Sequence, residues 1–287
     1  MSGDIEFGIS ITPLWANQSE ALLLTQVADE AGLDLVGIQD HPYQWRFYDT
    51  WTLISYLAAK TSRVRFFPDV VNLRLRPPAV LAKAVASLDV LTEGRVELGL
   101  GAGGFSDAVV AMGGPRLSPG DAFQATEEAM DVIRLVWSGE RGVRYEGRHY
   151  QLAGLHTGPT PAHDIKIWVG ASGPRMLDLI GRKADGWVPS ASWAPPQDLP
   201  RYLRQIEAGA RGVGRDPDTI RCVYNVSGSI DPAGDGKDLL GPISYWVEEL
   251  SRIAGIGVDA FVFWPTGDDP VDQVRVFAEK VAPAVAR

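Results

Sequence analysis

The stretch from Val70 to Gly103 reads VVNLRLRPPAVLAKAVASLDVLTEGRVELGLGAG and contains a strand end, a helix and a second strand. Pro77 and Pro78 predict the start of the helix, because proline is favoured in the first helical turn. Thr92–Gly94 predicts its end, and the apolar run Val96–Gly101 follows. Two strands joined by a helix indicate a parallel pair with a helical crossover.

The same alternation of short apolar runs and amphipathic stretches extends over the whole chain. Eight runs are predicted to be strands: Phe7–Ile11, Leu35–Gln39, Val64–Val71, Val96–Gly101, Ile165–Gly170, Gly186–Val188, Cys222–Val226 and Ala260–Trp264. Further helices are predicted to be capped by Ser19 and stopped by Gly32, to start at Asp121 and close at Gly139, and to open at Pro174. Eight such units favour an α/β fold of the closed (β/α)8, or TIM barrel, type over a doubly wound sheet.

One interval departs from this regular alternation of strands and helices. Roughly sixty residues separate the fourth and fifth predicted strands, far more than the usual barrel loop, which predicts an insertion at about residues 102–164. Within it, VRYEGRHYQL from Val143 to Leu152 predicts a hairpin around Glu146–Gly147, which we expect to roof part of the barrel mouth. No compositional break divides the chain, so residues 1–287 are expected to form one domain.

Composition excludes several classes of function. The net charge of −9 argues against a nucleic-acid partner. The single cysteine, Cys222, lies in an apolar run, and no two histidines have a metal-pair spacing, so we expect neither a disulfide nor a metal site. No apolar run is long enough for a signal core or a membrane span. We therefore expect a cytoplasmic enzyme without a membrane or nucleic-acid partner.

The carboxyl ends of the strands are where barrel enzymes place their chemistry. Asp40 and His41 follow the second strand, and an imidazole titrates near neutrality, so His41 is the strongest catalytic candidate, with its protonation set by Asp40. The alternative is that Asp40 caps a turn and His41 only packs. Four tryptophans near strand ends or loops predict an aromatic pocket, with packing under loops as the alternative: Trp15, Trp45, Trp193 and Trp264.

Two glycine-rich stretches follow strands. Gly170–Arg175 (GASGPR) runs into a helix, so its amides, the Ser172 hydroxyl and the Arg175 charge predict a phosphate site, although a plain tight turn is the alternative. Gly99–Gly104 (GLGAGG) lacks the spacing of a dinucleotide fingerprint. Its small residues instead leave room for a planar ring over the barrel.

Together these motifs resemble the luciferase-like monooxygenases and their deazaflavin-dependent relatives, which use FMN or the 8-hydroxy-5-deazaflavin coenzyme F420. The resemblance covers nearly the whole chain. It rests on Asp40-His41 with Trp45, on Val70–Gly103, on YEGRHYQL, and on IWVGASGPRMLDLIGRKADGW from Ile167 to Trp187.

The resemblance implies roles for individual residues, and the Asp-His pair with Trp45 favours the deazaflavin branch. His41 would transfer a proton, Asp40 would lie at the ring edge, and Trp45 would be the aromatic on the substrate side. The resemblance also implies a cis peptide bond at Val70–Val71, within one residue, and a homodimer formed through helices of the second and third units. The residues expected to contact the cofactor are Asp40, Val70, Val71, Asn72, Ala102, Gly103, Asp107, Gly170, Ser172 and Gly173.

One position departs from these relatives, which carry a glutamate where this chain has Gly104. Either Asp107, the nearest carboxylate, replaces it from a shifted loop, or the chemistry differs. The leading hypothesis is hydride transfer between coenzyme F420 and a small, fairly apolar organic substrate. The alternatives are an FMN-dependent monooxygenase supplied by a separate flavin reductase, and a non-catalytic flavin-binding barrel.

Overall fold

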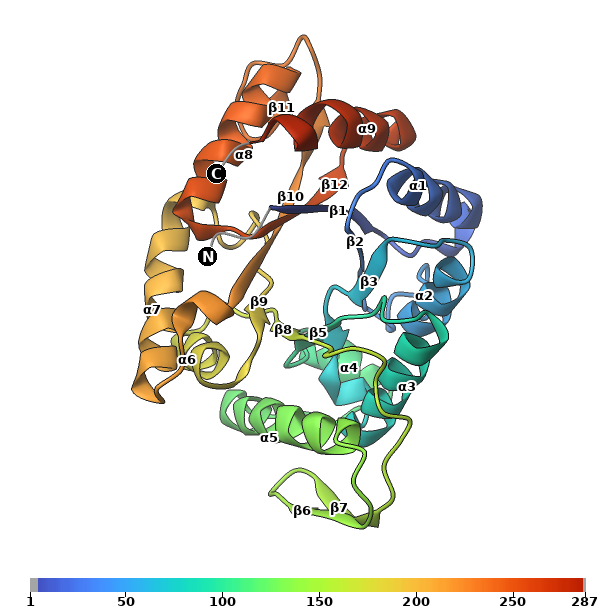
Figure 1. The fold of residues 1–287 in the computed structure, drawn as a ribbon, viewed down its shortest axis with the longest axis vertical. Helices are drawn as coiled ribbons and strands as arrows, with labels where there is room; N and C mark the ends of the chain where they lie inside the picture. Colours follow the sequence, from blue (N-terminus) through green and yellow to red (C-terminus); the bar gives the residue numbers. More distant parts are fainter. Residues whose placement is uncertain (1–4, 286–287) are drawn as a thin grey trace.

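The protein is a closed barrel of parallel strands surrounded by helices, as the computed structural model of residues 5–285 shows (Figure 1). Its strands follow the order β3-β2-β1-β12-β10-β9-β8-β5-β4, and every neighbouring pair in this order is parallel. β3 and β4 are two halves of the third predicted strand. A parallel bridge between Phe66 and Val96 closes the ring. The predicted (β/α)8 barrel is therefore confirmed.

All eight predicted strands are present, with small differences at their ends. The barrel strands are β1 (Glu6–Ile11), β2 (Leu35–Ile38), β3 (Arg65–Pro68), β4 (Val71–Asn72), β5 (Leu98–Gly101), β8 (Ile167–Val169), β9 (Gly186–Trp187), β10 (Arg221–Ile230) and β12 (Ala260–Pro265). Outside the ring lie β6 (Val143–Glu146), β7 (Gln151–Leu155) and β11 (Leu240–Gly241).

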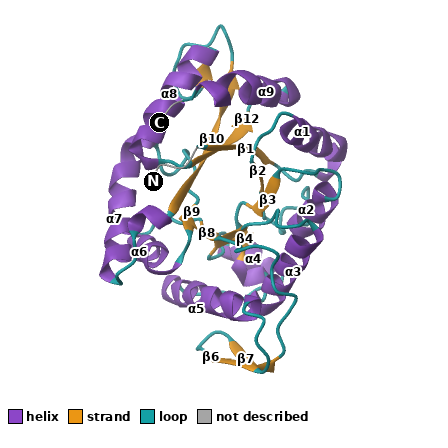
Figure 2. Ribbon diagram, viewed as in Figure 1, coloured by secondary structure: helices purple, strands orange, loops and turns teal. Residues whose placement is uncertain are grey.

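Helices cover the outside of this ring, as the purple elements of Figure 2 show. They are α1 (Gln18–Glu30), α2 (Thr50–Ala58), α3 (Pro78–Leu91), α4 (Ser106–Ala111), α5 (Pro119–Trp137), α6 (Pro174–Lys183), α7 (Leu199–Gly212), α8 (Ile243–Gly257) and α9 (Pro270–Val276). None of the described helices is long and apolar enough to cross a membrane.

Side chains alternate between the two faces of each barrel strand, as the period of two requires. Outward residues such as Ile9 and Val36 join the main core under the helices, whereas Phe67 and Trp168 belong to a separate core inside the ring. The Phe67 and Trp168 rings meet edge to face with centroids 5.2 Å apart. A Cβ atom at Gly37 would lie only 2.8 Å from the Phe67 ring, so this strand needs glycine there.

Two helix starts differ from the sequence predictions. α1 begins after Asn17, and Ser19 lies inside its first turn rather than capping it. α5 begins at Pro119, and the Ser118 side chain accepts a hydrogen bond from the Asp121 amide. The true cap therefore precedes Asp121 by three residues, as expected for a serine N-cap. The predicted openings at Pro78 and Pro174 are confirmed.

The hairpin within the insertion between the fourth and fifth strands does not roof the barrel mouth. α5 occupies the fourth helix position, packed between α3 and α6. The hairpin β6–β7 is present as predicted, but it lies on the outer side of α5, at the bottom of Figure 1. Glu128 of α5 holds it there by accepting hydrogen bonds from the amides of Arg148, His149 and Tyr150 at 2.8–3.1 Å. Packing on a helix decided its position, so the roof prediction was wrong for this hairpin, whereas Phe105, at the start of the same insertion, packs against the ring of His41.

Candidate active site

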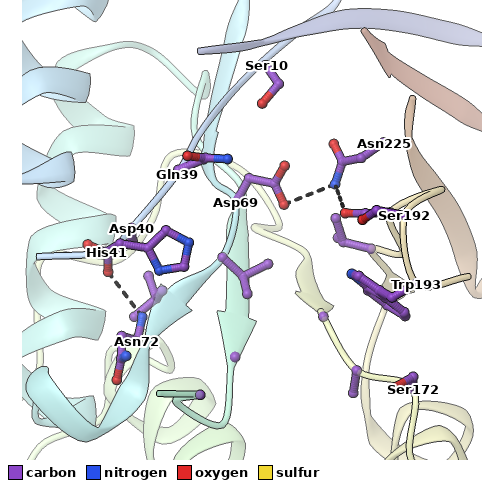
Figure 3. Close-up of a pocket in the computed structure, with 18 of the residues that line it drawn as sticks. Ser10, Gln39, Asp40, His41, Asp69, Asn72, Ser172, Ser192, Trp193 and Asn225 are labelled. Atoms are coloured by element: carbon purple, nitrogen blue, oxygen red, sulfur yellow. Dashed lines mark hydrogen bonds between the residues drawn. The ribbon is translucent and has the colours of Figure 1, made fainter. Parts of the chain in front are cut away.

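A cavity of about 730 Å³ opens at the carboxyl ends of the barrel strands, within the size range of cofactor and ligand sites. It brings together most of the residues singled out from the sequence. Those that line it are Asp40, His41, Val70, Val71, Asn72, Ala102, Gly103, Gly170, Ser172, Trp193 and Trp264. Figure 3 shows side chains from opposite sides of the barrel pointing into this space.

Asp40 is fully buried and holds the end of the third strand in place. Its carboxylate accepts two hydrogen bonds from Arg76, at 3.0 and 2.9 Å, and a third from the Asn72 amide at 3.1 Å. The two bonds to Arg76 form a forked ion pair, the geometry in which arginine binds a carboxylate most strongly. Asp40 therefore contributes structure, and its charge is neutralised before any ligand binds.

His41 points its ring into the cavity (Figure 3). Its Nδ1 atom lies 2.8 Å from the Tyr43 hydroxyl, within hydrogen-bond distance, and Phe105 meets its ring edge to face at 5.8 Å. Burial lowers the pKa of His41 below its usual value, and the Asp40 charge offsets this only in part. Asp40 therefore acts on the pKa of His41 in the opposite direction to burial, and burial has the larger effect. An uncharged imidazole at neutral pH can both donate and accept a hydrogen bond.

The third strand is interrupted where it reaches the cavity. The peptide bond between Asp69 and Val70 is cis, one residue before the expected pair and within the stated range. The Val70 side chain projects toward Gly101 and Gly170, where an added Cβ would lie 2.7 and 3.0 Å from its methyl groups. Both glycines are therefore required, and they leave Val70 as an apolar ridge on this wall.

A second wall is formed by Asn72, Ala102 and Gly103. Gly103 has a φ of +82°, and a Cβ there would lie 2.7 Å from the Asn72 side-chain oxygen. Conformation and space thus both demand glycine. The Asn72 oxygen is buried and has no hydrogen-bond partner among the described residues. At Gly104, by contrast, a Cβ would meet nothing within 4 Å.

The start of α6 borders the cavity at Ser172. Ser172 lines the cavity, and Gly173 is the N-cap residue of the helix, with no side-chain cap. The amides of Ser172 and Gly173 donate to no described residue. Free amides at a helix start attract anions. Arg175 does not take part, because its guanidinium stacks on Phe123 at 4.3 Å, outside the cavity.

Three sequence-predicted site residues, Trp45, Asp107 and Gly173, are not part of the cavity lining. Trp45 is 73% exposed, with the Arg46 guanidinium 4.8 Å from its ring centre. Asp107 is almost fully exposed and forms an ion pair with Arg116 at 2.6 Å. Neither side chain lines the cavity, and both point to solvent, Trp45 from the loop after β2 and Asp107 from the first turn of α4. The roles that the resemblance implies for them stay predictions. Trp15 also lies outside, half exposed.

Sequence reasoning missed the polar floor of the cavity. Asp69 and Asn225 meet there, with Ser10 and Gln39 beside them (Figure 3). A signal was available, because Asp69 comes two residues after the inward-facing Phe67, and alternation points both side chains into the barrel. A carboxylate in an inward position of an otherwise apolar strand is costly and therefore informative. Among the described residues, no cluster of side chains could hold a metal ion.

Comparisons with known proteins agree with this geometry. The family model described as luciferase-like monooxygenase matches residues 5–233. An F420-dependent glucose-6-phosphate dehydrogenase from Microbacterium testaceum (strain StLB037) is 29% identical, covering 100% of this chain and 99% of the relative. A 5,10-methylenetetrahydromethanopterin reductase from Methanolobus tindarius is 33% identical over 78% of this chain and 65% of its own.

A solved structure has the same fold. It is an F420-dependent secondary alcohol dehydrogenase in complex with an F420-acetone adduct, with a TM-score of 0.89 and 20% sequence identity. The match covers 99% of this chain and 100% of the other.

Proposed function

Because this chain belongs to the luciferase-like monooxygenase family, we propose that it is an oxidoreductase that transfers a hydride between coenzyme F420 and a small organic substrate. Sequence relatives that align over most of the chain are named for F420-dependent reactions or for a pterin reduction, which supports a redox role. When bound, the deazaflavin ring supplies a carbon, C5, that accepts or donates the hydride. The protein supplies position and proton transfer.

The observation that carries the proposal is the shape of the cavity wall where the third strand is interrupted, between β3 and β4. Gly101 and Gly170 have no side chains and leave the Val70 methyl groups projecting there, so a flat ring can lie against them. We assign the ring edge to Val71, Asn72, Ala102 and Gly103, which continue this wall.

The phosphate end of the cofactor is assigned to the start of α6. The free amides of Ser172 and Gly173 and the Ser172 hydroxyl are the donors that an anion needs in a chain whose net charge is negative. Asp40 acts indirectly, because its carboxylate accepts hydrogen bonds from the Asn72 amide and from Arg76 and so holds both beneath the edge of the bound ring. His41, uncharged and directed into the cavity, is placed to exchange a proton with the bound ligands.

The cavity favours an uncharged substrate. No lysine or arginine is among the described residues that line it, and its charged Asp40 is already paired with Arg76. A sugar phosphate needs such cations, because burying an unpaired phosphate is costly. Trp193 and Trp264 give the substrate side aromatic surface. We therefore propose a small, fairly apolar alcohol, carbonyl compound or activated alkene rather than the substrate named for the glucose-6-phosphate relative.

Titration of the purified protein with oxidised F420 and with FMN tests the cofactor. Fluorescence quenching is expected to give a dissociation constant for F420 at least about tenfold below that for FMN. Tighter binding of FMN would replace the proposal with an FMN-dependent monooxygenase that needs a separate flavin reductase. Binding of either cofactor without turnover of any alcohol, aldehyde, ketone or enone in a screen would leave a non-catalytic flavin-binding barrel.

A matched pair of variants tests the phosphate site. Gly173→Asp puts a carboxylate beside the free amides, and it should weaken F420 binding at least about tenfold by like-charge repulsion. Gly212→Asp is the control, because Gly212 is exposed at the end of α7 and a Cβ there meets nothing within 4 Å. Equal affinities in the two variants would refute the assignment. A homodimer remains a prediction, which light scattering in solution can check.

A further inference from the structure

The floor of the cavity is closed by a hydrogen bond that crosses the barrel. The Asn225 side-chain amide donates to the Asp69 carboxylate at 3.2 Å (Figure 3). Asp69 follows β3 and Asn225 belongs to β10, and three strands separate these two on either side of the ring. The bond therefore places one carboxyl group near the barrel axis, directly below the space available to ligands.

This carboxyl group has no basic partner. No described lysine, arginine or histidine forms an ion pair with Asp69, and Asn225 is its one side-chain hydrogen-bond partner among the described residues. The other ionisable groups that line the cavity are Asp40, which Arg76 neutralises, and His41 and Tyr43, which contact each other. β1, β5, β8, β9, β10 and β12 contribute none. Enclosure by protein raises the pKa of Asp69 to about 6, so both of its protonation states are accessible near neutrality.

Two other positions considered as a source of an acid do not supply one to the described cavity lining. Asp107 is turned to solvent and paired with Arg116, and Gly104 presents no side chain. Among the residues that the structure describes, Asp69 is thus the only carboxyl group that both lines the cavity and lacks a cationic partner. An enclosed carboxyl group without a cationic partner opposes folding. A role as a positioned acid or base accounts for its presence here.

We propose that Asp69 is a second acid–base group of the site, distinct from His41, and exchanges a proton with the oxygen of an uncharged alcohol or carbonyl substrate. In carbonyl reduction the substrate carbon takes a hydride, with its two electrons, from the reduced deazaflavin. The carbonyl oxygen takes the proton of the Asp69 carboxyl group as the C=O π bond becomes the new O–H bond. The Asp69 carboxylate then regains a proton from cavity water. Alcohol oxidation runs the same steps in reverse. This inference rests on the proposed function.

The first test needs no substrate. Protein labelled with ¹³C at the aspartate carboxyl carbons is titrated from pH 4 to 8, and the Asp69 signal is identified by its absence in Asp69→Asn. We expect a midpoint near pH 6, and a higher midpoint in Asn225→Ala, because the Asn225 hydrogen bond lowers the pKa of Asp69. The exposed Asp107, identified in the same way with Asp107→Asn, supplies a reference signal from outside the cavity. Added oxidised F420 should shift the Asp69 signal and leave that of Asp107 unchanged. A midpoint below about 5, or no response to F420, would overturn the proposal.

The second test is turnover as a function of pH. Asp69→Asn should keep F420 affinity within a few-fold and lower kcat about 10²–10⁴-fold. In wild type, the rate of carbonyl reduction should fall as pH rises through the Asp69 midpoint, and alcohol oxidation should fall as pH drops through it. This break should be lost in Asp69→Asn and kept in His41→Asn and Asp107→Asn. Wild-type rate and pH profile in Asp69→Asn would overturn the inference, whereas failure of the wild type to bind F420 would instead overturn the proposed function.

Discussion

Replacing Asp69 by asparagine is expected to stabilise the protein at pH 8. In the folded state the pKa of Asp69 is about 6, against an ordinary value of 3.8. Between these pH values the folded protein holds a proton that the unfolded chain has released, so stability falls as pH rises. Two pKa units correspond to about 3 kcal/mol of unfavourable free energy above pH 6. This 3 kcal/mol is an upper limit, because Asp69 is only partly buried and borders the cavity. Asparagine has a similar shape and no charge, so it removes this cost.

Urea unfolding at two pH values measures the effect. Asp69→Asn should raise the free energy of unfolding by up to about 3 kcal/mol at pH 8 and by about half as much at pH 5, where the folded carboxyl group is mostly protonated. Asp107→Asn, at an exposed carboxylate, should change it by less than about 0.5 kcal/mol at either pH. A destabilised Asp69→Asn at pH 8, or an equal gain at both pH values, would refute the reasoning. Gain of stability with loss of turnover would mark Asp69 as a residue kept for function.

Three further substitutions test other residues. His41→Asn should retain F420 affinity and thermal stability but lower turnover about 10²–10⁴-fold, whereas a lower melting temperature with normal turnover would make His41 a packing residue. Asp40→Ala leaves Arg76 partly buried without its main partner and should cost about 3–5 kcal/mol in urea unfolding; a loss under 1 kcal/mol would contradict this. The carboxylates of Glu97, 3.6 Å from Nε2, and Asp89, within hydrogen-bond distance of Nδ1 at 2.8 Å, raise the pKa of His163. His163 therefore stabilises the folded state fully below pH 6.5 and ceases to do so as pH rises through its folded pKa. His163→Gln should therefore lower the melting temperature at pH 6 and hardly at pH 9, and an equal loss at both would exclude a titrating role.

Local patterns in the sequence were sufficient for the barrel. Short apolar runs and proline or glycine at helix ends are short-range properties, so all eight strands and the helices opening at Pro78 and Pro174 could be predicted. The glycine-rich turn at Gly103 was also readable, because positive φ and close packing select glycine. The position of the β6–β7 hairpin was not, since its contacts with Glu128 on α5 are tertiary.

The order of residues alone indicates which strand ends carry polar groups, whereas the neighbours of each polar group follow from the folded barrel. Asp40 lies beside His41 in the chain, yet its charge is taken by Arg76, 36 residues away. Asp69 looked like part of an apolar strand until closure of the ring brought Asn225, 156 residues away, within 3.2 Å of it. Desolvation and charge pairing depend on everything within a few ångströms in space, and barrel closure makes those neighbours from distant segments.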